Sequence, residues 1–172
     1  KWKTFHDFLI HYIPAIFGKE WGNIELRKPL DERHPVCVWY YHLCHYQKTH
    51  ETDREVIHTA PMTGAAAAYL GLAYNLYLLA HNVRLQEVLI GRLKNPALFL
   101  GACYETYVAA AFIKAGFLIE LEDESDPRQS HCEFVATYEQ TGRRFSVEAK
   151  ARAPGKANLM VGNQLHAALS KN

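Results

Sequence analysis

The sequence has almost no net charge. Its 19 lysines and arginines oppose 18 aspartates and glutamates, which leaves a formal charge of +1 over 172 residues. A chain with this balance does not attract a polyanion over long distances, so a nucleic-acid partner would have to be bound by locally clustered basic residues. A glycine-rich phosphate-binding loop is also missing, and the order of the residues supports no Ser-His-Asp triad. The sequence therefore gives no support for a P-loop nucleoside triphosphatase or a serine hydrolase.

Cysteine is scarce, with four residues in the chain. Cys37 and Cys44 are seven positions apart on an expected helix, which separates them by roughly 10 Å, too far for a disulfide. The stretch from His34 to His50 is rich in histidine, but it has no Cys-x2-Cys pair and no His-x3-His couple, so we do not expect zinc. No signal peptide is recognisable, and we expect free thiols, a reducing compartment and a cytoplasmic protein.

Long uncharged runs are also rare, and the exception is GAAAAYLGLAYNLYLLA, residues 64–80. A membrane-spanning helix needs about 20 apolar residues. This run is shorter and is interrupted by Asn75. We therefore expect a buried helix of a bundle and no membrane partner.

Helical periodicity dominates the first half of the chain. Apolar residues recur at helical spacing in four segments of the first 95 residues, whereas the segment around Pro29 and Pro35 is turn-like. Asn95, followed by proline, is a favourable start for a further helix, which we expect to run to Gly116.

The periodicity changes after this helix. Three segments alternate in polarity as strands do: FLIELEDE, then about residues 132–139 and 144–151. A loop and a further expected helix follow. This order predicts an α+β protein with an α/β-type core. We expect a helical region at 1–95, whose role the sequence does not identify, and the core at 96–172.

Polar residues on two of these strands predict a common site. Glu148 and Lys150 point away from the apolar face of the third expected strand, and Glu133 does so on the second. A loop of two or four residues between the strands would place Glu133 opposite Lys150 and Val135 opposite Glu148. A loop of three or five residues would put Glu133 on the other side of the sheet.

A third carboxylate lies on the preceding helix. Glu105 is the only acidic residue between Asn95 and Gly116, and its neighbours at helical spacing are small or apolar. Burial without a partner would be costly, and a cation shared with Glu133 and Glu148 is one possible partner. Hard oxygen ligands suit Mg²⁺ or Mn²⁺. The alternative is that all of these residues are ordinary solvent-facing charges.

This order of a helical glutamate, a strand acid and a strand Glu-x-Lys resembles the PD-(D/E)xK nuclease superfamily, which has the restriction-endonuclease-like fold. The resemblance covers about residues 95–172. It implies a three-stranded mixed sheet flanked by helices, and a Mg²⁺-dependent endonuclease that cleaves phosphodiester bonds in DNA rather than RNA. The matching residues are Glu105, Glu133, Glu148, Ala149 and Lys150.

The resemblance also implies a role for each residue. Glu133, Glu148 and the carbonyl of Ala149 would coordinate the metal. Glu105 would support this metal or a second ion, and Lys150 would lie near the attacking water. Apart from the resemblance, we expect Arg152 and Lys156 to contact nucleic acid, because they make this region locally basic. Gln164, which we also expect to contact nucleic acid, lies where some family members carry a glutamine that supports the site.

The chain departs from the family pattern in two respects. The acid of the second strand is usually an aspartate, often after proline, whereas here Glu133 follows Cys132. Members also carry a fourth strand after the next helix, so we expect the core to be incomplete at its C-terminus. The rival interpretation is a catalytically inactive protein of this fold that binds nucleic acid or another protein. The helical first half would guide substrate or form a homodimer.

Overall fold

The computed structural model describes residues 2–50, 56–57, 59–121 and 133–151. These residues form helices and one sheet, which confirms the expected α+β class. The helices are α1 (Phe5–Phe17), α2 (Lys19–Leu26), α3 (Pro35–His50), α4 (Gly64–Leu78), α5 (Val83–Lys94) and α6 (Phe99–Lys114). The strands are β1 (Phe117–Leu121), β2 (Phe134–Tyr138) and β3 (Arg144–Val147).

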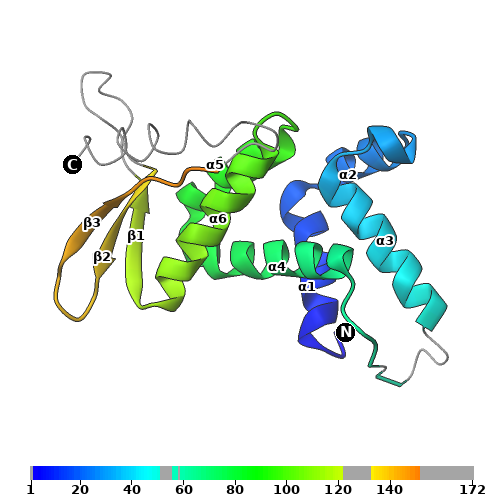
Figure 1. The fold of residues 1–172 in the computed structure, drawn as a ribbon, viewed down its shortest axis with the longest axis horizontal. Coiled ribbons are helices and arrows are strands. Elements are labelled where there is room, and N and C mark those ends of the chain that lie inside the picture. Colours follow the sequence, from blue (N-terminus) through cyan, green and yellow to red (C-terminus); the bar gives the residue numbers. More distant parts are fainter. Residues whose placement is uncertain (1, 51–55, 58, 122–132, 152–172) are drawn as a thin grey trace, which may run out of the picture.

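The sheet and the first three helices occupy opposite ends of the molecule (Figure 1). Helices α1, α2 and α3 lie at one end and the sheet lies at the other, with α5 and α6 next to it. Helix α4 runs between these two ends and packs against α1, α3 and α6. The expected site residues that the structure describes therefore come from the part of the molecule where α5 and α6 meet the sheet.

The uncharged segment of the sequence forms α4, which has one face buried in a hydrophobic core and another face that is partly exposed. Ala73 and Leu76 have no exposed surface, and Tyr69 has almost none. Burial of such side chains contributes about 1.5–3 kcal/mol for each large apolar group. In the described part of the chain, no helix combines the length and the apolar character that crossing a membrane requires.

Two hydrophobic cores hold the elements together. The first joins α1, α3, α4 and the beginning of α6. The second lies between the sheet and the helices α5 and α6, where Leu85, Leu89 and Ala109 pack with Phe134 and Ala136. Residues on both sides of position 95 contribute to each core, and α6 contributes to both.

The described strands form an antiparallel sheet in the order β1-β2-β3. The resemblance had implied a mixed sheet, and no strand pair among these residues is parallel. The connections explain the pairing, because the short turn between β2 and β3 can only join antiparallel neighbours.

The register of the β2–β3 hairpin differs from the expected one. Val135 pairs with Ser146, so the expectation that it faces Glu148 is wrong. The N–H of Tyr138 donates to the carbonyl of Arg143 at 2.8 Å, which closes the hairpin one residue earlier than expected. The observed register differs from the expected one by two positions. Only a shift by an odd number of positions would turn the paired residues to the other face, so the paired residues of β2 and β3 share the faces that were expected.

Helix α2 forms where the sequence analysis expected a turn-like segment. It ends at Leu26, before Pro29 can interrupt it, and a short 3₁₀ helix follows at Leu30–Glu32. Pro35 is the first residue of α3, where proline is tolerated because its missing N–H would have no helical partner. The two prolines delimit helices here and do not prevent them.

Helix α6 begins later than expected. Asn95 is not its N-cap, because the helix begins four residues later and Leu98 holds the cap position. The Oδ1 of Asn95 accepts the N–H of Ala97 at 3.0 Å, within the turn that precedes the helix. This bond stabilises a turn of the kind that asparagine favours, and the helix begins at Phe99. The expected C-terminal end is confirmed, since Gly116 follows with a φ of 83°, which glycine adopts without strain.

A proline inside α1 is compensated by a side chain of α4. Pro14 has no N–H, so the carbonyl of Ile10, four residues earlier, lacks its helical donor. The hydroxyl of Tyr69 donates to this carbonyl at 2.9 Å in the buried interface. Burial raises the pKa of Tyr69, so the hydroxyl keeps its proton. This bond fixes how α4 faces α1.

The pairing of Tyr69 with Pro14 can be tested by a double-mutant cycle. We expect Tyr69→Phe to lower the free energy of unfolding by about 1–3 kcal/mol, because it leaves a buried carbonyl without a donor. In a Pro14→Ala background the loss should be much smaller, since the new N–H of residue 14 can bond to Ile10. Urea denaturation of the four proteins of the cycle gives the loss in each background.

The control is Tyr77→Phe, which removes a hydroxyl from a partly exposed position on the same helix. It should change the free energy of unfolding by less than about 0.5 kcal/mol. An equal loss from Tyr69→Phe in both backgrounds would contradict the compensation.

Candidate metal and catalytic site

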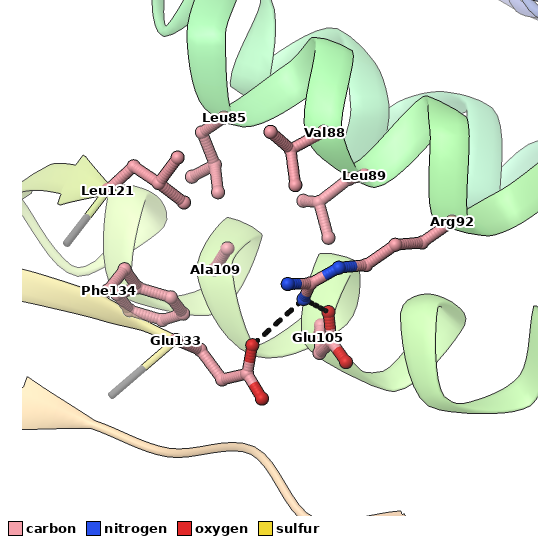
Figure 2. A pocket seen from close by; sticks show the side chains of 9 residues that line it. All are labelled: Leu85, Val88, Leu89, Arg92, Glu105, Ala109, Leu121, Glu133 and Phe134. Carbon is pink, nitrogen blue, oxygen red and sulfur yellow. Dashed lines mark hydrogen bonds and ion pairs between the residues drawn. The ribbon is translucent and has the colours of Figure 1, made fainter. Parts of the chain in front are cut away.

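A small pocket opens where α5, α6 and the start of β2 meet (Figure 2). Its apolar wall belongs to the second hydrophobic core, and its three charged residues come from three different places in the chain. Arg92 lies on α5, Glu105 on α6, and Glu133 immediately before β2. The pocket is lined by Leu85, Val88, Leu89, Arg92, Glu105, Ala109, Leu121, Glu133 and Phe134.

One nitrogen atom of Arg92 bridges the two carboxylates. Its Nη1 donates to Oε2 of Glu105 at 2.7 Å and to Oε2 of Glu133 at 2.9 Å. The side chains of Arg92, Glu105 and Glu133 are 30%, 15% and 23% exposed, so water screens these charges only in part. The two acids are thus held around one positive charge.

Helix α5 presents Arg92 to the pocket through its amphipathic pattern. Leu85, Leu89 and Leu93 are buried at intervals of four. Arg92 is three residues after Leu89 and seven after Leu85, so it lies beside this apolar stripe. Its aliphatic stem can cover apolar surface while the guanidinium reaches the carboxylates. Arg92 was not predicted as a site residue. Its position beside the buried leucines of α5 would have indicated that its charge lies close to the core.

The two acids set the protonation of Arg92. Burial alone would lower the pKa of its guanidinium, but the hydrogen bonds and charges of Glu105 and Glu133 outweigh that effect and raise the pKa. The guanidinium therefore keeps its positive charge at every pH at which the protein is folded.

Glu133 lies on the side of the sheet that faces the helices, which differs from the expected placement. It was expected opposite Lys150, on the face away from Phe134, yet Glu133 and Phe134 line the same pocket. The N–H of Glu133 donates at 2.9 Å to the carbonyl of Val147, which is the ladder partner of Phe134. Two successive residues thus meet one partner, as in a β-bulge, and the alternation of faces does not extend to Glu133.

Glu148 and Lys150 form a second pair of expected site residues. Strand β3 ends at Val147, so both residues and Ala149 lie beyond the strand and not on it. Lys150 Nζ and Glu148 Oε1 form an ion pair, in which Glu148 is mostly buried and Lys150 is exposed. Glu148 directly follows the residue that bonds to the Glu133 backbone. The backbone of Glu133 and the backbone that leads to Glu148 and Lys150 are therefore adjacent.

The donor chemistry suits a hard divalent cation. Glu105 and Glu133 already share one positively charged group, and carboxylate oxygens are the ligands that Mg²⁺ and Mn²⁺ prefer. Within residues 2–50, 56–57, 59–121 and 133–151, no three His, Cys, Asp or Glu side chains are grouped to hold a metal ion. The structure thus joins Glu105 and Glu133 around Arg92, and it does not group Glu148 with them.

The expected nucleic-acid-binding residues and the cysteines lie apart from this pocket or outside the described residues. Arg152, Lys156 and Gln164 lie outside the described residues. Cys37, Cys44 and Cys103 are free thiols, as expected for the described cysteines. Burial raises the pKa of Cys37 to about 11, which makes it a poor nucleophile and a poor metal ligand.

No family model, curated protein or solved structure matches the chain. What the site can do is therefore inferred from the contacts of its own side chains.

The bridge can be tested through stability. We expect Arg92→Met to lower the free energy of unfolding by about 1–3 kcal/mol, because it leaves two carboxylates facing each other without a cation. The loss should be smaller in a Glu105→Gln background, where one of the two charges is already gone. Urea denaturation at low salt measures the cycle.

Arg144→Met serves as the control, because Arg144 forms an exposed, 3.4 Å ion pair with Glu120. It should change the free energy of unfolding by less than about 0.5 kcal/mol. If Arg92→Met costs the same in both backgrounds, the shared bridge does not contribute as described.

Proposed function

We propose that the protein is a Mg²⁺-dependent nuclease that hydrolyses phosphodiester bonds, with DNA as its substrate. One observation carries the proposal: Glu105 and Glu133, 28 positions apart in sequence, direct their carboxylates to a single cationic atom. Glu148 and Lys150 start from the adjacent backbone. The set of three acids and a lysine is the one that the PD-(D/E)xK resemblance assigns to this chemistry.

The acids form the ligand set in this proposal. Glu133 and Glu148 would hold the metal together with the carbonyl of Ala149, and Glu105 would support the ion from α6. Metal binding would therefore have to bring Glu148 to the two carboxylates that Arg92 already joins. The carboxylates of Glu105 and Glu133 are largely shielded from water, which strengthens their attraction for a cation. When bound, the divalent ion would supply Lewis-acid stabilisation of the charge that develops on the phosphate.

Lys150 orients the attacking water. Its ammonium group lies against Glu148 while most of the side chain stays exposed, so it can reach a substrate that approaches from solvent. An ammonium group at this position donates hydrogen bonds to the water and to the developing negative charge. Glu148 keeps the lysine oriented, since the two side chains form an ion pair.

Cleavage by point variants tests the assignment. We expect Glu148→Gln and Lys150→Ala each to reduce Mg²⁺-dependent cleavage of plasmid DNA by about 100-fold or more, since each removes a group that acts in the reaction. Gel analysis of nicked and linear products gives the rate, and circular dichroism checks folding.

Matched controls are Glu120→Gln and Lys48→Ala, which remove the same charges from exposed positions on β1 and α3. Both should cleave as the unaltered protein does. Full cleavage by Glu148→Gln and Lys150→Ala would refute the proposed roles. If the unaltered protein binds DNA without Mg²⁺ and never cleaves it, the catalytically inactive alternative is correct.

A further inference from the structure

A positive charge already occupies the place where two metal ligands meet. Arg92 Nη1 donates one hydrogen bond to a carboxylate oxygen of Glu105 and one to a carboxylate oxygen of Glu133. In Figure 2 the second oxygen of each carboxylate points away from the guanidinium. Arg92 therefore does for these acids part of what a bound cation would do: it neutralises them and fixes their separation.

We propose that Arg92 is a positioning residue that competes with the divalent metal for Glu105 and Glu133 and so weakens metal binding by the free protein. The inference rests on the proposed nuclease function, since it needs that metal site. It adds a residue and a role that the resemblance does not supply.

The sign of the effect follows from the charges. A guanidinium beside the site repels a doubly charged ion, and this repulsion grows with the product of the two charges. Arg92 also orders the two glutamates, which favours metal binding, but this gain is limited to the rotamer freedom of two side chains. The carboxylates are largely shielded from water, so the repulsion is only partly screened. We therefore expect repulsion to dominate.

A purely structural bridge would act in the opposite direction. If Arg92 only held the acids in place, its removal would loosen the site and weaken metal binding. If it competes with the metal, its removal tightens binding even though the protein becomes less stable. Metal affinity therefore separates the two roles, whereas a loss of activity would not.

The experiment is a calorimetric titration of the full chain with Mn²⁺, without nucleic acid. We expect Arg92→Gln to bind Mn²⁺ about tenfold more tightly than the unaltered protein, a change on the scale of metal second-shell effects. Arg92→Lys keeps the positive charge and should bind as weakly as the unaltered protein. Arg84→Gln is the matched control, since it removes the same charge from an exposed position on α5, two turns away, and should change nothing.

The outcomes distinguish this inference from the function on which it rests. If the unaltered protein binds Mn²⁺ and Arg92→Gln binds it equally or more weakly, the competition is refuted and the nuclease proposal stands. If neither protein binds Mn²⁺, or Glu105→Gln and Glu133→Gln leave binding intact, the proposed metal site itself is refuted. Thermal denaturation of each variant, recorded before titration, confirms that only folded protein is compared.

Discussion

The site depends on the ion bridge between Arg92, Glu105 and Glu133. Two ionised carboxylates repel each other in a partly buried pocket, and a cation between them offsets that repulsion. Arg92 provides that cation, and the bridge joins α5, α6 and the residue that leads into β2. The surrounding apolar wall limits access of water, which keeps the interaction strong.

Periodicity in the sequence was enough to predict most of the fold. The spacing of apolar residues identified α1, α3, α4, α5 and α6, and the change from helical to alternating spacing identified the three strands. Two local features were misjudged for a common reason. Pro29 and Pro35 were taken as breakers when they delimit helices. Asn95 was taken as the cap of α6, but it lies in a turn and the helix begins only at Phe99. In each case, the preferences of proline and asparagine for helix ends did not decide at which of several neighbouring residues the helix begins.

The site was predictable in composition but not in geometry. Glu105 attracted attention as an isolated acid on an apolar helix, and it does meet Glu133. Strict alternation along β2 put Glu133 on the wrong face, because the irregular bond from its N–H to Val147 cannot be deduced from residue types. Arg92 was overlooked since a surface arginine is common, and only the packing of α5 against α6 gives it this partner set.

Helix α6 packs into both hydrophobic cores, which gives the two halves of the site different rigidity. Glu105 is carried by an element whose backbone amides should be among the last to exchange with solvent, because opening it would disrupt both cores. Glu148 and Lys150 follow the end of the β3 ladder, beyond the described strand pairing. Glu105 is thus carried by a helix that both cores hold in place, whereas Lys150 lies on the segment that follows the sheet.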